Sequence, residues 1–176
     1  MKKVFPSVLT LGNLLLGFSA ILFIYQGQTA ASMMLILLGL FCDFFDGFCA
    51  RKLNAVSEMG RELDSLADLV TFGIAPAALA YVTSLHEIRV LGAASCLAYV
   101  CCGALRLARF NTAQSHMPGF VGMPIPLAAI LLIVLLTLSL NPMLVAFGAL
   151  LLSLLMVSRL SFPSLKKIKP EVAEDC

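Results

Sequence analysis

Six apolar segments, each close to the length that crosses a lipid bilayer, constrain the fold of this chain more than any other feature. A helix needs about 20 predominantly apolar residues to span the hydrocarbon layer. Asn141 and Pro142 give a turn signal between the last two segments. We therefore predict six transmembrane helices, over residues 4–25, 30–52, 60–85, 90–109, 124–140 and 143–157.

Composition supports an all-α polytopic membrane protein. The 176 residues are 60% hydrophobic and 12% charged, whereas soluble domains are roughly half apolar and about a quarter charged. The first apolar run continues to Tyr25, too long for the core of a signal peptide, so we expect it to be retained. We predict one membrane domain over residues 1–160 and a cytoplasmic tail over residues 161–176. The net charge of +2 and the lack of a basic-aromatic patch argue against nucleic acid as a partner.

The distribution of lysine and arginine predicts the orientation. With six spans both termini lie on one side, and of the 12 basic residues only Arg89 falls on the other side. Because basic loops stay in the cytoplasm, both termini are predicted to be cytoplasmic and the protein to lie in the cell membrane. The basic residues on that side are Lys2, Lys3, Arg51, Lys52, Arg61, Arg106, Arg109, Arg159, Lys166, Lys167 and Lys169.

The cysteines carry no sign of a metal or redox site. The chain has six, five of them lie inside apolar segments, and none forms a Cys-x-x-Cys pair. We expect them to be small buried apolar residues.

Four aspartates stand in the second and third apolar segments. Asp43 and Asp46 are three residues apart and share one helix face. Gly60, Asp64 and Asp68 follow at intervals of four and form a stripe on the next helix. A short connection makes the two helices antiparallel neighbours, so facing stripes would gather all four carboxylates near the cytoplasmic surface.

The chemistry that suits such a cluster is a pair of divalent cations. An ionised carboxylate within a membrane costs about 2.5–3.5 kcal/mol, so four of them call for positive charge. Mg²⁺ takes carboxylate oxygens and shares its ligation with substrate phosphates, and two such ions can clamp a displacement at phosphorus. Gly47, Ala50 and Gly60 leave space beside the carboxylates, and Arg51 stands where it can meet a phosphate.

A simpler interpretation treats the aspartates as helix-end carboxylates paired with Arg51, Lys52 and Arg61. That interpretation suffices for one aspartate. Four carboxylates on two facing stripes, with small residues between them, favour the metal site instead.

These residues resemble the signature of the CDP-alcohol phosphatidyltransferases. The pattern Asp43-x2-Asp46-Gly47-x2-Ala50-Arg51-x8-Gly60-x3-Asp64-x3-Asp68 matches it at every defined position. Six helices, with the motif across the second and third and a cytoplasmic active site, also resemble that family. The resemblance therefore covers most of the chain.

The resemblance implies an activity and a set of site residues. Family members move a phosphatidyl group from a CDP-linked lipid to an alcohol and release CMP. It implies that Asp43, Asp46, Asp64 and Asp68 hold two ions, Mg²⁺ or Mn²⁺, and that Asp68 is the general base. It also implies a homodimer in membrane lipid. The residues it places at the cytidine-diphosphate site are Gly47, Ala50, Arg51 and Gly60.

Two polar residues of the first segment can be interpreted in two ways. Thr10 and Asn13 share a helix face, so they can reach the nucleotide of the CDP-lipid. They can equally form hydrogen bonds within the helix bundle.

The acceptor is predicted from the end of the fourth segment and the loop expected to follow from Phe110. Arg106, Arg109 and Asn111 lie in a stretch that resembles the branch of the family that uses L-serine, which implies serine binding. An arginine fork suits the serine carboxylate, and both arginines share a helix face. Either could instead anchor the protein to anionic headgroups.

Other functions remain open at this stage. A sister enzyme would use glycerol 3-phosphate or inositol phosphate, acceptors that should demand a denser basic cluster. A divalent-cation transporter would need polar residues beyond Asp68, whereas residues 69–82 are almost all apolar. A non-catalytic membrane scaffold would not need the carboxylates.

Overall fold

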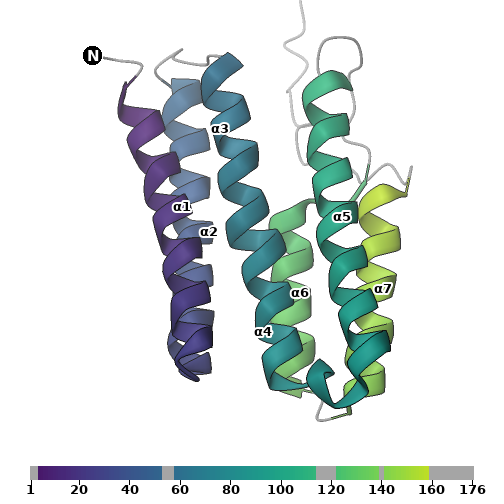
Figure 1. The fold of residues 1–176 in the computed structure, drawn as a ribbon. Coiled ribbons are helices and arrows are strands. Elements are labelled where there is room, and N and C mark those ends of the chain that lie inside the picture. The colour runs from purple at the N-terminus through teal and green to yellow at the C-terminus, as the bar shows by residue number, and fades with distance from the viewer. Residues whose placement is uncertain (1–3, 53–57, 114–121, 139–140, 159–176) are drawn as a thin grey trace, which may run out of the picture.

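The computed structural model describes residues 4–52, 58–113, 122–138 and 141–158 (Figure 1). At residues 4–7, 46, 49–52 and 113 it describes the backbone alone. These ranges are mostly helical and contain no strand. The helices are α1 (Val4–Tyr25), α2 (Thr29–Lys52), α3 (Glu58–Asp68), α4 (Ala75–Thr83), α5 (Arg89–Ala113), α6 (Ile125–Leu138) and α7 (Pro142–Val157), with a π-helical turn at Leu69–Ile74 and a 3-10 turn at Leu85–Ile88.

The predicted helices are confirmed in place, and local chemistry explains several of their ends. Gly27, two residues after the end of α1, has a φ of 77°, a left-handed conformation that glycine adopts without strain. Asn141 caps α7, because its side chain accepts a hydrogen bond of 3.0 Å from the Met143 amide. Pro142 follows at the first position of the helix, where a missing N–H costs nothing.

Three helical stretches are long and apolar enough to cross a membrane, namely Val8–Tyr25, Glu58–Thr83 and Leu85–Thr112. Three further apolar helices are shorter in the described part of the chain, Thr29–Phe45, Ile125–Leu138 and Pro142–Val157. Exposed leucine and phenylalanine side chains along the bundle, such as Leu15, Phe41 and Leu154, suit a lipid environment. Together these helices indicate a membrane protein.

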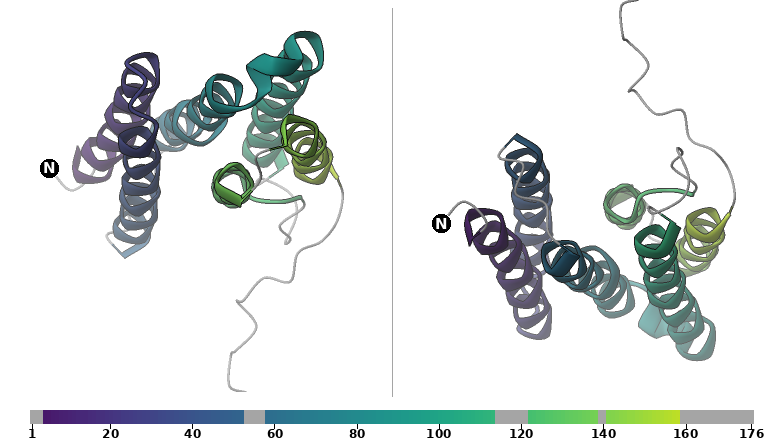
Figure 2. Two further views of the ribbon diagram at one scale, coloured as in Figure 1. Left: turned by 90° about the horizontal axis from the view of Figure 1, so that it is seen from below. Right: turned by 90° about the horizontal axis from the view of Figure 1, so that it is seen from above.

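The helices form two groups on either side of a central rod. The rod is α3, the π-turn and α4 in succession; α1 and α2 pack together on one side, and α5, α6 and α7 lie on the other (Figure 2). The beginning of α1, the end of α2, the beginning of α3 and the ends of α5 and α7 all lie at one end of the bundle (Figure 1). The aspartate motif of α2 and α3 is therefore at that same end.

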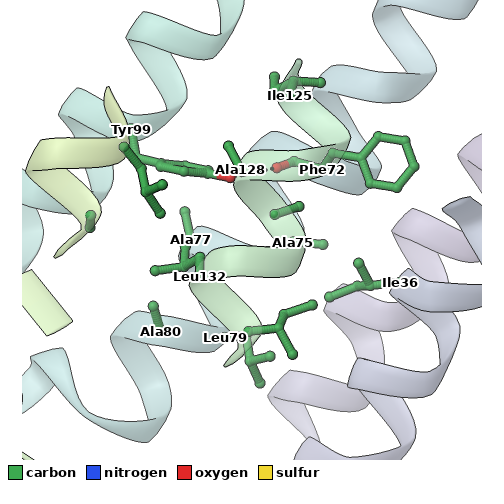
Figure 3. Packing of buried hydrophobic residues seen from close by; sticks show 14 of the residues in the cluster. Ile36, Phe72, Ala75, Ala77, Leu79, Ala80, Tyr99, Ile125, Ala128 and Leu132 are labelled. Atoms are coloured by element: carbon green, nitrogen blue, oxygen red, sulfur yellow. Dashed lines mark hydrogen bonds between the residues drawn. The ribbon is translucent and has the colours of Figure 1, made fainter. Parts of the chain in front are cut away.

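The apolar core lies around the π-turn and α4, the part of the rod that follows Asp68. Phe72 of the π-turn and Leu79 of α4 are buried beside Tyr99 of α5 and Leu132 of α6 (Figure 3). Alanines such as Ala128 let the helices approach closely, as is common where helices associate in membranes.

Four cysteines in the described ranges are free thiols. Cys42, Cys96 and Cys102 are half-buried, while Cys101 is exposed on α5. The predicted burial is therefore wrong for Cys101, which faces outward from an apolar helix.

The prediction of a loop from Phe110 is wrong for its first four residues. Helix α5 continues to Ala113, so Arg106, Arg109 and Asn111 all stand on a helix. The last turn of α5 contacts α3, because the side-chain amide of Asn111 donates a hydrogen bond of 3.0 Å to Oγ of Ser65. Residues 114–121 of the predicted loop, which ran to Met123, and the predicted tail, residues 161–176, lie outside the described residues.

The third predicted segment, residues 60–85, contains a feature that the sequence did not predict. A π-helical turn, Leu69–Ile74, interrupts the rod directly after Asp68. The amide of Ala75 bonds to the carbonyl of Val70, five residues earlier instead of four. Pro76 follows and has no amide hydrogen to continue an α-helical pattern.

Candidate metal site and active site

Three carboxylates meet between α2 and α3. Ligand oxygens of Asp43 from α2 and of Asp64 and Asp68 from α3 all lie within 4.8 Å of one another. Asp68 is buried, with 8% of its surface exposed, and the other two are half-buried. The spacing of four between Asp64 and Asp68 places them on one face of α3, toward Asp43. The predicted convergence of the two stripes is confirmed for these three residues.

Asp46, the fourth predicted ligand, lies on α2 three residues after Asp43. Its side chain is outside the described part of the structure. Its role as a ligand stays a prediction.

The donor set fits a hard divalent cation. Carboxylates this close repel one another, and burial of Asp68 adds the cost of removing a charge from water. A divalent cation offsets both effects and prefers oxygen ligands. The carboxylates of Asp43, Asp64 and Asp68 are thus suited to Mg²⁺ or Mn²⁺.

Asn13 of α1 adjoins the cluster. It is fully buried, and its Nδ2 donates a hydrogen bond of 3.2 Å to Oδ1 of Asp68. From its sequence position, Asn13 could either contact the nucleotide or form hydrogen bonds within the bundle. The structure gives it a bundle partner, and that partner is the predicted general base. Thr10, one turn earlier, is also buried.

The other residues predicted at the nucleotide site stay predictions. Gly47 on α2 and Gly60 on α3 are half-buried on the two helices that carry the carboxylates. Ala50 and Arg51 lie on the last turn of α2, and their side chains are outside the described part of the structure.

The two arginines weighed equally from sequence have different surroundings. Arg106 is half-buried with its guanidinium carbon 5.8 Å from the centre of the Phe110 ring, and the charge of Asp68 acts on it. Its Nε has no hydrogen-bond partner among the described residues. Arg109 is exposed, and its Nη1 donates to the Val157 carbonyl of α7 at 3.1 Å. Arg106 therefore belongs to the carboxylate end of the site, while Arg109 joins α5 to α7.

Asn111 links α5 to α3 beside the acidic stripe. Its Nδ2 donates to Ser65 Oγ at 3.0 Å and to Glu62 Oε2 at 3.1 Å. Sequence reasoning singled out Asn111 but missed Ser65 and Glu62. Glu62 stands two residues before Asp64 and Ser65 directly after it, yet nothing in their spacing signals a partner on a distant helix.

The fold and the site together define a helical membrane protein with a cluster of carboxylates that could hold a divalent metal ion. The chain belongs to the CDP-alcohol phosphatidyltransferase family, which it matches over residues 3–159.

Curated relatives share almost its whole length. A protein of Bacillus subtilis (strain 168), a CDP-diacylglycerol–serine O-phosphatidyltransferase, is 48% identical over 96% of this chain and 95% of its own length. A protein of the same name from Helicobacter pylori (strain 26695) is 35% identical over 94% of this chain and 74% of its own length. One from Methanocaldococcus jannaschii is 38% identical over 88% of this chain and 71% of its own length.

Proposed function

We propose that this protein transfers the phosphatidyl group of CDP-diacylglycerol to the hydroxyl of L-serine, giving phosphatidylserine and CMP. The near-full-length similarity to the Bacillus subtilis enzyme carries the proposal. The carboxylate cluster of Asp43, Asp64 and Asp68 supports it, because a diphosphate substrate calls for metal at this place.

Asp43, Asp46, Asp64 and Asp68 would hold two divalent cations, Mg²⁺ or Mn²⁺. When bound, the cations supply charge neutralisation at the diphosphate and stabilise the departing CMP. Thr10, Gly47, Ala50, Arg51 and Gly60 would line the site of the cytidine diphosphate.

Asp68 is the group that accepts the proton of the serine hydroxyl. The serine oxygen forms a bond to the phosphatidyl phosphorus, and the bond from that phosphorus to the bridging oxygen breaks, so that CMP leaves with the electron pair. An ordinary aspartate is a weak base at neutral pH, so position has to supply much of its effect. The hydrogen bond from Asn13 fixes the position of Oδ1 of Asp68.

Arg106 is the residue best placed to bind the serine carboxylate. Its guanidinium lies against the Phe110 ring and interacts electrostatically with Asp68. Its Nε has no hydrogen-bond partner among the described residues, so this donor can bind a substrate. An arginine fork pairs well with one carboxylate. Arg109 and Asn111 form hydrogen bonds to α7 and α3, respectively, and would hold the helices around the serine site in place.

The proposal also includes the arrangement of the chain in the membrane. The chain crosses the cell membrane six times, with both termini and the active site on the cytoplasmic side, and forms a homodimer. The basic residues near the motif and the position of the motif at the end of the bundle where α1 begins and α7 ends support this orientation (Figure 1).

Transport of a divalent cation is disfavoured by what lies beyond Asp68. Thr71 is fully buried with its hydroxyl bonded to the Asn13 carbonyl, and Phe72, Ala75 and Leu79 beyond it belong to the apolar core. No polar path leads from the cluster through these described residues.

The acceptor is tested with purified protein, CDP-diacylglycerol and Mn²⁺. CMP release is measured with serine, glycerol 3-phosphate or inositol phosphate as the only acceptor. We expect release with serine and phosphatidylserine as the lipid product. Release with glycerol 3-phosphate or inositol phosphate but not with serine would assign the protein to a sister activity.

A further inference from the structure

The π-turn Leu69–Ile74 begins at the residue after the predicted general base. In a regular α-helix the amide of residue 76 would bond to the carbonyl of Phe72, but Pro76 has no amide hydrogen. The chain instead widens by one residue, and Ala75 bonds back to Val70. Single π-turns within α-helices occur frequently at functional sites.

The widened turn sets the angle between two helix faces. Each residue advances an α-helix by about 100°, so one extra residue rotates everything before it relative to everything after it by about that amount. Before the turn, Asp64 and Asp68 face Asp43 in the carboxylate cluster; after it, Ala75 and Leu79 face the apolar core. Both faces are correctly directed only while the π-turn is kept.

Tyr99 of α5 holds one side of the π-turn. Its hydroxyl donates a hydrogen bond of 3.2 Å to the carbonyl of Phe72, the group that Pro76 leaves without an α-helical donor. Tyr99 is fully buried, and Figure 3 shows it reaching from α5 toward Phe72. A buried carbonyl without a donor is costly, so this bond stabilises the widened form.

Thr71 holds the other side. Its hydroxyl donates a hydrogen bond of 3.0 Å to the main-chain carbonyl of Asn13 on α1. The side chain of the same Asn13 donates to Asp68. Thr71 thus fixes the backbone of the residue whose amide fixes the base.

Two glycines make this approach possible. A Cβ at Gly17 of α1 would collide with the Thr71 hydroxyl and lie 2.8 Å from its Cα. A Cβ at Gly39 of α2 would lie 2.6 Å from Cγ2 of Thr71 and 2.9 Å from Oδ1 of Asn13. Thr71 is therefore enclosed by the backbones of both helices, and α1, α2 and the π-turn cannot shift independently.

We propose that Thr71 and Tyr99 are positioning residues, which hold the π-turn and thereby place Asp68 in the carboxylate cluster. The inference rests on the proposed function for the role of Asp68, although the geometry is independent of the acceptor. The two hydroxyls bond to backbone carbonyls and not to the carboxylates; each acts through the turn, and Thr71 also through Asn13.

The experiment compares four variants of the purified full-length protein. Thr71→Val and Tyr99→Phe each remove one hydroxyl and keep most of the side-chain shape, and Thr71→Ser keeps the hydroxyl. Ser153→Ala is the matched control, because this buried hydroxyl bonds only within α7, to the Ala149 carbonyl at 2.7 Å. Mn²⁺ binding is followed without substrate by the electron paramagnetic resonance of free Mn²⁺, and steady-state kinetics supply kcat and KM.

Loss of a residue that supports metal ligands typically costs 10–100-fold in metal affinity or activity, so for these more distant residues we expect a loss of about tenfold. Thr71→Val and Tyr99→Phe should lower kcat and weaken Mn²⁺ binding, with both KM values nearly unchanged. Thr71→Ser and Ser153→Ala should resemble the parent protein.

Parent-like Mn²⁺ binding and kcat in Thr71→Val or in Tyr99→Phe overturns the proposal, as does an equal loss in Ser153→Ala. If Thr71→Val does not fold, Tyr99→Phe alone decides. Because Mn²⁺ binding is measured without an acceptor, a parent protein that is inactive with serine would count against the proposed function and not against this inference.

Discussion

The close approach of α1 to the π-turn predicts opposite effects for two substitutions on one helix. Gly12 and Gly17 both lie in α1, and in Gly12→Ala the new Cβ would meet nothing within 4 Å. In Gly17→Ala it would collide with the hydroxyl of Thr71 and lie 2.8 Å from Cα and 2.9 Å from Cβ of that residue. Backbone atoms of a packed helix cannot move aside as the end of a flexible side chain can.

The magnitudes follow from these contacts. Alanine is favoured over glycine within a helix by about 1 kcal/mol, a gain that both variants share. Overpacking costs about 1–3 kcal/mol. Displacing the Thr71 hydroxyl from the Asn13 carbonyl costs about 1 kcal/mol more. Gly17→Ala should therefore lose about 1–3 kcal/mol net, while Gly12→Ala should be neutral or stabilised.

The assay is thermal unfolding in detergent, followed with a dye that reacts with cysteine thiols as they become accessible. At about 2–4 °C per kcal/mol for a chain of this size, Gly17→Ala should melt about 5 °C below the parent protein. Gly12→Ala should melt at or above the parent temperature. Equal melting temperatures for the two variants would refute the close packing of Thr71 against α1.

Two further predictions concern the ligands of the site. Asp43→Asn should abolish Mn²⁺ binding at the cluster and turnover, because it removes a charged ligand oxygen from a group of three within 4.8 Å, and calorimetric titration that shows unchanged Mn²⁺ binding would contradict this. Arg106→Lys should raise the KM for serine at least tenfold with little change in the KM for CDP-diacylglycerol, since lysine lacks the planar fork. Arg109→Lys serves as its control and should change the KM for serine less than threefold; similar increases in both variants would contradict the distinction between them.

Much of the fold could be predicted from the sequence, because hydrophobic length and turn chemistry are local signals. The six helical segments are confirmed, and the turn at Gly27 after α1 and the cap of α7 at Asn141 follow ordinary rules. The continuation of α5 past Arg109 was not predicted, since it is stabilised by a hydrogen bond between Asn111 and Ser65, which are 46 residues apart in the sequence.

The candidate site was predictable where spacing carries the information. Intervals of four placed Asp64 and Asp68 on one face, and the antiparallel arrangement brought Asp43 to them. The π-turn was not predicted, although Pro76 lies directly after it. A proline inside an apolar run can end, kink or widen a helix, and the choice here depends on Tyr99 and Thr71, whose partners on other helices cannot be read from periodicity.

We propose that the carboxylate cluster drives phosphatidyl transfer to serine, with Asp68 as the base. The most direct measurement is CMP release from CDP-diacylglycerol by the purified protein with Mn²⁺ and serine, in parallel with Asp68→Asn. We predict serine-dependent CMP release by the parent protein, and no release by the folded variant although it still binds CDP-diacylglycerol. Retained turnover in Asp68→Asn would contradict the assignment of the base, and the absence of serine-dependent release by the parent protein would contradict the proposed function.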